Sequence, residues 1–149
     1  MFVPCKLTCL LACLVLVGRA EGQEEEEEVK KEGDLYVLNE WNFDPFIETN
    51  NNVLVVFYSP FNDRSLLYME DVFEKAARRL AAEQFDVKMA KLDADDASCF
   101  HICLRYVTLA FLPRVLLSTY YGEHMVFRDQ AWSVEALIDW LKKKIHKKI

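Results

Sequence analysis

The stretch Val53-Leu-Val-Val-Phe-Tyr-Ser-Pro60 decides the fold, because it is an unbroken apolar run that ends at a proline. Such a run is typical of a strand covered on both faces of a sheet. Behind the short loop Phe61-Asn-Asp-Arg-Ser65, apolar residues recur with helical spacing from about Leu67 to Glu83. The sequence therefore predicts a buried strand, a short turn and a long helix in direct succession.

The loop lies where a cysteine thiol would be activated, yet it contains no sulfur. A helix N-terminus favours the thiolate and lowers a cysteine pKa, so redox enzymes place Cys-x-x-Cys between such a strand and helix. Asn62 and Ser65 stand where the two thiols would be, with Asp63 and Arg64 between them. A serine hydroxyl does not replace a thiolate, because it has no redox couple.

The strand and loop from Leu54 to Phe61 resemble those of a thioredoxin-fold domain of the protein disulfide isomerase family, which reads Cys-Gly-His-Cys after an aromatic residue. Val87-Lys-Met-Ala-Lys-Leu-Asp-Ala94 resembles the family's third strand, and the segment from Ala131 to Lys142 resembles its last helix. The similarity covers residues 34 to 145. The resemblance implies an α/β thioredoxin fold, with a central mixed β-sheet flanked by helices.

The resemblance also implies two further catalytic elements that this chain lacks. The family places a buried glutamate in the central strand to move protons to and from the second cysteine, and the matching residue here is Val56. It often has an arginine shortly before a cis-proline, whereas the loop Thr108-Leu-Ala-Phe-Leu-Pro113 contains none. With the thiols, three elements are missing, so we predict a non-catalytic domain without a cofactor.

A different function is implied for the apolar residues Phe61, Phe111, Leu112 and Pro113. In the resembled family, the equivalent loops form a cleft that holds an extended substrate peptide. Here that cleft would be apolar and free of thiols, which favours binding of unfolded or partner polypeptides, a chaperone-like role. The alternative is that these four residues only close the end of the hydrophobic core. A structural or regulatory subunit that docks on a larger partner is a further reading.

Cys99 and Cys103 are the two cysteines outside the N-terminal segment. Spaced i and i+4 on a helix they share one face, where a disulfide needs distortion. A metal site would need more ligands than the nearby His101, so no metal is predicted. Two interpretations stay open: small apolar side chains at a partly buried helix face, or a displaced redox pair that makes the protein a weak thiol-disulfide oxidoreductase or isomerase.

Residues 1 to 20 have the layout of a signal peptide. Lys6 precedes a mostly apolar run from Leu7 to Val17, and Gly18-Arg-Ala20 offers small residues for cleavage. The run is shorter than the about 20 residues that span a bilayer. We therefore expect no membrane span after cleavage, a retained signal anchor being the alternative. Cleavage of this segment would remove three cysteines: Cys5, Cys9 and Cys13.

Residues 21 to 33 are acidic and low in complexity, with Glu24 to Glu28 unbroken, and we expect a disordered leader before a domain over residues 34 to 149. Calcium buffering or docking is the alternative role for the leader. Loss of the signal peptide takes the net charge from −6 to −8, which argues against nucleic acid as a partner. The expected location is the endoplasmic reticulum lumen or outside the cell. The terminal His146-Lys-Lys-Ile149 is no Lys-Asp-Glu-Leu-like retrieval signal, so retention stays open.

The remaining segments predict the order βαβαβαββα. Asp44-Pro45 should cap and open a helix, Ser133 should cap the last one, and Tyr121-Gly122 should form a turn. We expect strands over residues 35–38, 87–92, 114–118 and 124–127, and helices over residues 44–49, from Asp95 or Asp96 to 106, and from Ser133 onward.

Overall fold

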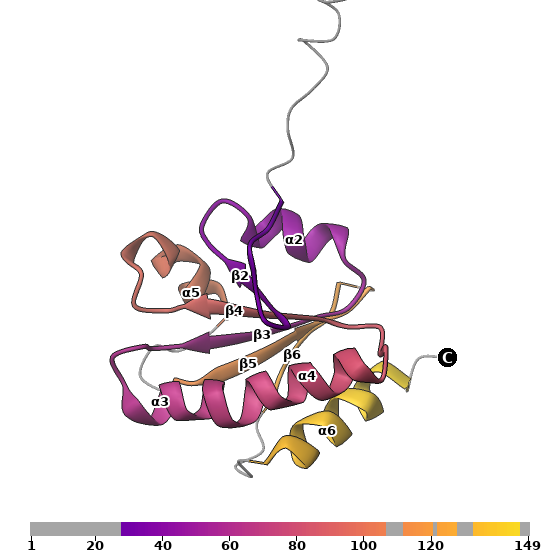
Figure 1. The fold of residues 1–149 in the computed structure, drawn as a ribbon. Helices are drawn as coiled ribbons and strands as arrows, with labels where there is room; N and C mark the ends of the chain where they lie inside the picture. The colour runs from indigo at the N-terminus through magenta and orange to yellow at the C-terminus, as the bar shows by residue number, and fades with distance from the viewer. Residues whose placement is uncertain (1–27, 107–111, 121, 128–132, 147–149) are drawn as a thin grey trace, which may run out of the picture.

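The computed structural model describes residues 28–106, 112–120, 122–127 and 133–146. They form a mixed six-stranded sheet in the order β1-β2-β4-β3-β5-β6 (Figure 1). The middle strands β2, β4 and β3 are mutually parallel, and the outer strands β1, β5 and β6 run antiparallel to their inner neighbours. The strands are β1 (Lys31–Glu32), β2 (Leu35–Leu38), β3 (Val53–Tyr58), β4 (Lys88–Asp93), β5 (Arg114–Ser118) and β6 (His124–Val126).

Helices cover both faces of this sheet, as the sequence predicts (Figure 1). One face carries α2 (Phe43–Thr49), the 3₁₀ turn η2 (Ala97–Cys99) and α5 (Phe100–Tyr106). The other face carries α3 (Asp63–Tyr68), the π-helical turn η1 (Met69–Phe73), α4 (Glu74–Ala82) and α6 (Val134–His146).

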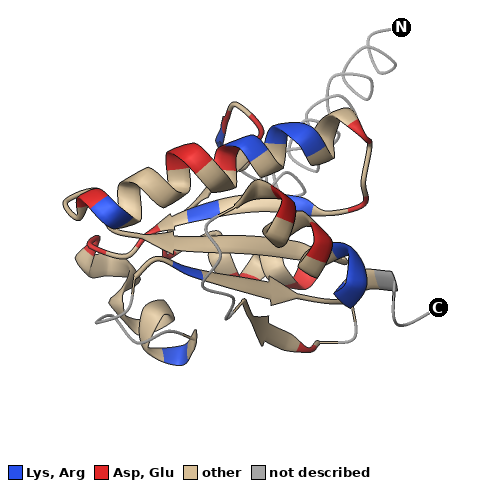
Figure 2. Cartoon of the chain, turned by 90° about the horizontal axis from the view of Figure 1, so that it is seen from below, with Lys and Arg blue, Asp and Glu red and all other residues tan. Residues whose placement is uncertain are grey.

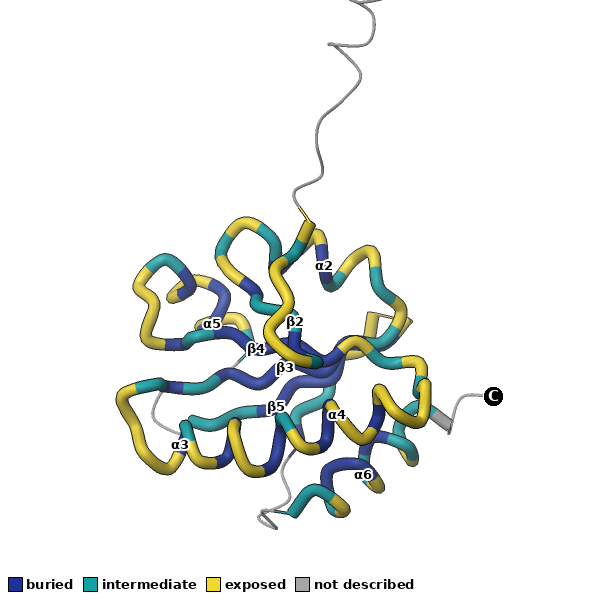
Figure 3. Tube along the Cα trace, in the orientation of Figure 1, coloured by how far each residue is buried: buried dark blue, intermediate teal, exposed yellow. Residues whose placement is uncertain are grey.

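The central strand β3 separates two hydrophobic cores. Its residues from Val53 to Phe57 are all fully buried, and Figure 3 shows the sheet as the most buried layer. Leu54 and Val56 face α4 and α6, whereas Val53, Val55 and Phe57 face α2 and α5. Burial of each such side chain contributes about 1.5–3 kcal/mol, which explains the unbroken apolar run.

The long helix runs without a break from Asp63 to Ala82 through α3, η1 and α4. It begins earlier than the expected Leu67, because Asn62 caps it: the Asn62 side-chain oxygen accepts a hydrogen bond from the Ser65 backbone N–H at 3.1 Å. A π turn accommodates an extra residue within an α-helix. In this chain it keeps Met69, Val72 and Phe73 on the buried face.

The ordered fold starts before Asp34, which corrects the expected boundary of the leader. Lys31–Glu32 forms the edge strand β1, and the Val37 backbone N–H donates to the Lys30 carbonyl at 2.8 Å. Gly33 sits in the tight turn between β1 and β2 with φ +58°, a conformation that glycine adopts readily. The element order therefore has one strand more than predicted.

Helix α2 begins at Phe43, so the expected cap at Asp44 is wrong. The Asn39 side-chain oxygen accepts hydrogen bonds from the backbone N–H groups of Trp41 and Asn42, which closes the turn ahead of the helix. Asp44 instead pairs with Arg105 of α5 at 3.0 Å.

The predicted cap at Ser133 is confirmed, and of the two residues expected to open the next helix, Asp95 or Asp96, the structure has Asp96 as the cap. Ser133 Oγ accepts from the Ala136 N–H at 3.0 Å, and Asp96 accepts from the Ser98 N–H at 3.0 Å. The predicted turn at Tyr121-Gly122 lies partly outside the described residues, and Gly122 has φ +75°.

Candidate functional site

The loop between β3 and α3 presents one exposed and one buried position at the two motif sites. Asn62 is exposed at the helix start, whereas Ser65, one turn later, is fully buried. The Ser65 hydroxyl oxygen accepts a hydrogen bond from the Ser59 backbone N–H at 2.8 Å. Asp63 and Arg64 between them are exposed. The loop therefore has the exposed and buried pair of positions that a dithiol would need, without the sulfur.

Phe61 is the most exposed large apolar residue of this end of the molecule, with 89% of its surface accessible. It directly precedes the Asn62 cap and follows Pro60, so the rigid strand and helix on either side position the ring. Large aromatic side chains bury much of their surface when they find a partner. Phe61 therefore presents a large apolar side chain to solvent at this end of the molecule.

Leu112 and Pro113 lie beside the same loop. The Leu112–Pro113 peptide bond is cis, as the sequence predicts, and both residues are half-buried. Arg114 follows and pairs with Phe57 of β3, which places Leu112 and Pro113 next to the strand end that leads to Phe61. The fourth predicted residue, Phe111, lies outside the described residues.

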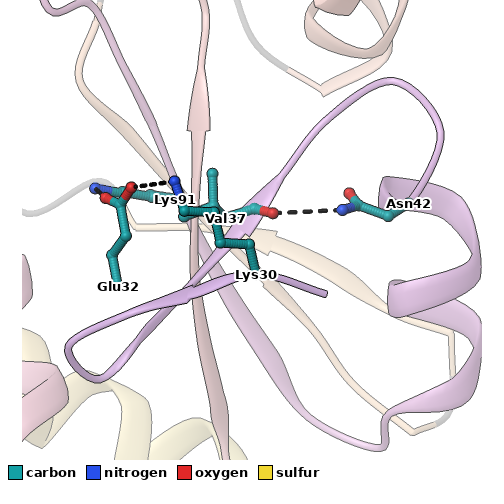
Figure 4. A network of polar contacts seen from close by, with 5 residues as sticks. All are labelled: Lys30, Glu32, Val37, Asn42 and Lys91. Atoms are coloured by element: carbon teal, nitrogen blue, oxygen red, sulfur yellow. Dashed lines mark hydrogen bonds and ion pairs between the residues drawn. The ribbon is translucent and has the colours of Figure 1, made fainter. Parts of the chain in front are cut away.

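Val56 is fully buried in the core, and its neighbour on β4 is Lys91. The Lys91 side chain is only 10% exposed, and its ammonium lies 2.6 Å from the Glu32 carboxylate (Figure 4). Glu32 also pairs with Lys30 at 3.1 Å. Hydrogen bonds from Lys91 and Lys30 lower the pKa of Glu32. The counter-charge of this buried lysine thus comes from β1, while Val56 beside it is apolar.

Sequence reasoning missed the pairing of Lys91 with Glu32. The available signal was a lysine within the apolar middle of a strand, Met89-Ala-Lys-Leu92. Buried lysines require a partner. Figure 4 also shows Asn42, whose amide donates to the Val37 carbonyl at 3.4 Å and so attaches the turn before α2 to β2.

The end of β4 is joined to the end of β3 at this site. The Ala94 N–H donates to the Tyr58 carbonyl at 2.8 Å, and the Ser59 hydroxyl donates to the Asp95 carboxylate. The Asp95 N–H donates in turn to the Asp93 carboxylate at 2.9 Å. The aspartates after β4 are therefore held against the residues that lead into the Phe61 loop, a contact that sequence reasoning also missed.

Cys99 and Cys103 are both buried in the core on the α2 and α5 face, and both are free thiols. Burial raises the pKa of Cys99, and burial raises the pKa of Cys103 to about 11. The thiolate is the reactive form of cysteine, and both thiols lie in surroundings that favour the protonated form. The structure favours their interpretation as small apolar core residues.

No group of three or more His, Cys, Asp or Glu side chains among the described residues is arranged to hold a metal ion. No helix within the described ranges is both long and apolar enough to cross a bilayer.

No family model matches the sequence. The Mus musculus Protein disulfide-isomerase A4 is 37% identical over 71 residues, which are 48% of this chain and 11% of that protein. The Gallus gallus Protein disulfide-isomerase is 31% identical over 144 residues, which are 93% of this chain and 24% of that protein. The solution structure of the first thioredoxin domain of mouse Protein disulfide-isomerase A4 superposes with a TM-score of 0.66 at 24% identity, covering 82% of this chain and 83% of that domain.

Sequence and structure agree on the same class of protein. The chain contains a protein disulfide-isomerase-like thioredoxin domain. It spans 11% to 24% of the length of the two curated relatives named above. The α/β thioredoxin fold predicted from the strand, loop and helix around Phe61 is thereby confirmed.

The two buried thiols of this thioredoxin domain should resist alkylation. At pH 7 we expect Cys103 to react with iodoacetamide roughly 100-fold more slowly in the native protein than in the unfolded chain, because a pKa of about 11 leaves little thiolate. Cys99 should be protected in the same direction. Peptide mapping by mass spectrometry after timed alkylation, with and without guanidinium chloride, measures both. Equal rates in the two states would revive the redox-pair interpretation.

Proposed function

We propose that this chain is a redox-inactive thioredoxin-fold protein of the secretory pathway that binds unfolded or partner polypeptides. The observation that carries the proposal is the combination of a thiol-free loop with the 89% exposed Phe61 beside it. The β3–α3 loop lies where a thioredoxin domain would contact a polypeptide. It contains no cysteine that could exchange a disulfide with that polypeptide.

The redox-inactive part rests on three positions. Asn62 and Ser65 occupy the exposed and buried sites of the loop, and neither side chain forms a disulfide. Val56 places no carboxylate in the core beneath them. The thiols of the chain's α5 region are buried with raised pKa values, so they do not take over the reaction.

The binding part rests on where the apolar side chains lie. Phe61 on one loop and Leu112 with Pro113 on another are brought to the same end of the sheet by the pairing of β3 with β5. Burial of one exposed aromatic side chain by a client contributes about 1.5–3 kcal/mol. Exposed apolar surface of this kind commonly marks interaction sites.

The secretory location rests on the N-terminal sequence. Lys6, the apolar run to Val17 and the small residues before Glu21 have the layout of a cleaved signal peptide. We propose the endoplasmic reticulum lumen or the extracellular space as the location.

The variant Phe61→Asp should lose most of the binding. We expect roughly a 10- to 100-fold weaker suppression of client aggregation, measured by light scattering when a denatured model protein is diluted into buffer, because the charge cannot enter an apolar contact. The fold should be unaffected, since Phe61 is exposed. Far-ultraviolet circular dichroism and thermal unfolding check this.

The matched control is Tyr120→Asp, which changes an exposed aromatic residue (69% accessible) at the opposite end of the sheet. Val53 pairs with Ser118, so Tyr120 lies near the start of β3 rather than at its end. The control should keep full suppression. Equal suppression by wild type and Phe61→Asp would overturn the proposed site, and a stable stoichiometric complex with one partner would select the docking-subunit reading instead.

A further inference from the structure

The Phe61 loop is bordered by a rim of aspartates. The acidic rim consists of Asp63, Asp93, Asp95 and Asp96. Asp63 lies two residues beyond Phe61 in the first turn of α3. Asp93 is the last residue of β4, and Asp95 and Asp96 follow it in the chain. Figure 2 shows acidic segments gathered where the long helix begins and β4 ends.

The rim is held in place by contacts to the loop strand. Asp93 pairs in register with Tyr58, and Asp95 accepts the Ser59 hydroxyl hydrogen bond two residues before Phe61. Asp96 accepts hydrogen bonds from Ser98 through the backbone N–H and the hydroxyl, and these hydrogen bonds lower its pKa. The carboxylates are therefore fixed on the same side of the molecule as the apolar contact.

Asp93, Asp95 and Asp96 accept hydrogen bonds from backbone N–H and hydroxyl groups, which are neutral donors and leave the negative charge in place. By contrast, Glu32, Asp44, Glu83 and Glu135 elsewhere in the fold each have a basic partner. The negative charge of the rim acts on nearby groups. Burial raises the pKa of Cys99, and the charges of Asp96 and Asp93 raise it further. Arg64 and Arg114 are the cations at this end, and each has a contact within the chain.

Bound cations are a poor explanation for this charge. The carboxylates of Asp93, Asp95 and Asp96 already accept hydrogen bonds from backbone and hydroxyl groups, and the described residues contain no group of carboxylates arranged to hold a metal ion. The rim instead puts four carboxylates at the same end of the molecule as the exposed Phe61. A ligand that satisfies both features is an apolar side chain with positive charges close to it along an extended chain.

We propose that the site around Phe61 selects extended polypeptide segments in which a large apolar residue is flanked by lysine or arginine. The proposal rests on the proposed binding function and adds the class of client to it. Exposed ion pairs are individually weak, so two basic flanks together should give roughly tenfold preference over acidic flanks. The preference should fall with salt, because charges at this distance are screened.

The test compares two fluorescent peptides that share a central Phe-Leu pair and differ only in their flanks, two lysines in one and two glutamates in the other. Binding to the full chain is measured by fluorescence anisotropy at low and high sodium chloride concentration. We expect the lysine peptide to bind roughly tenfold more tightly at low salt, with the difference shrinking at high salt.

The variant Asp63→Asn/Asp95→Asn tests the rim itself. Asparagine at position 95 keeps an oxygen that accepts from the Ser59 hydroxyl, so the loop contact is preserved. The matched control is Glu70→Gln/Asp71→Asn, which removes the same charge from exposed positions of the long helix. The rim variant should lose most of the preference for the lysine peptide, and the control should keep it.

The outcomes separate the two proposals. Equal binding of both peptides by the wild type overturns the client preference and leaves the binding function standing. If the control variant loses the preference for the lysine peptide as fully as the rim variant does, the preference comes from net charge, and the role of the acidic rim is overturned. Binding of neither peptide overturns the proposed function, and the client preference falls with it.

Discussion

Replacing Asn62 and Ser65 together with cysteine should convert this thioredoxin domain into a thiol-disulfide oxidoreductase. The exposed position 62 lies at the start of a helix that runs to Ala82, and position 65 lies buried one turn later. The helix dipole and the free N–H groups of the first turn stabilise a thiolate at the first position. The second cysteine would then resolve the mixed disulfide that forms with a client.

The expected effect is large. Cysteines at helix N-termini have pKa values of about 3.5–7.5, so much of the thiol introduced at position 62 is ionised at neutral pH. Cys103, with a pKa of about 11, is almost entirely protonated there. We expect the new thiol to react with iodoacetamide roughly 1000-fold faster than Cys103, and the double variant to reduce insulin disulfides with dithiothreitol well above the wild-type background.

The single variants serve as the controls. Asn62→Cys alone should show the fast alkylation without efficient turnover, because it lacks the resolving thiol. Ser65→Cys alone should react slowly, because the position is fully buried. Alkylation of Asn62→Cys no faster than that of Ser65→Cys would mean that the loop does not activate a thiol. Insulin reduction by the unmodified wild type that is lost in Cys99→Ser/Cys103→Ser would contradict the proposed redox inactivity.

A glutamate in β3 should be tolerated at position 56 and not at position 55. Both valines are fully buried in the same strand, but they point to opposite faces. Val56 lies beside Lys91, a buried ammonium, whereas Val55 lies between Ala90 and Leu116. Burial without a partner raises the pKa of a carboxyl group by several units or unfolds the protein. A neighbouring cation instead stabilises the ionised form.

The expected difference decides whether the variants fold. Val55→Glu should cost about 5 kcal/mol or more, comparable to the whole stability of a small domain, and should be unfolded at neutral pH. Val56→Glu should cost about 2–3 kcal/mol less than that, since Lys91 supplies the counter-charge. Urea unfolding monitored by circular dichroism measures both free energies.

The uncharged variants Val55→Gln and Val56→Gln isolate the effect of charge, because they add the same bulk and polarity without ionisation. The gap between the two positions should be clearly smaller for glutamine than for glutamate. Equal gaps, or equal unfolding of both glutamate variants, would show that Lys91 is fully neutralised by Glu32 and offers no stabilisation to a second carboxylate.

Much of the candidate site was within reach of sequence reasoning. Phe61, Asn62 and Ser65 follow a strand whose apolar run can be read directly, and the cap at Asn62 forms within four residues. Leu112 and Pro113 were placed at the same end by the family resemblance, and the pairing of β5 with β3 puts them there. Such features depend on short-range patterns, for which the chain itself carries the information.

The sequence by itself determined the identity of the central strand, the empty thiol positions and the two-sided sheet, because periodicity and side-chain chemistry are local properties. Only the tertiary structure decided which distant residues meet. Glu32 reaches Lys91, and Asp95 reaches Ser59 across 36 positions of sequence. No local sequence pattern predicts the partner of a buried charge, because the register between strands that are far apart in the chain determines that partner. The acidic rim at the Phe61 end of the molecule and the pairing of β1 at the edge of the sheet are therefore products of the fold.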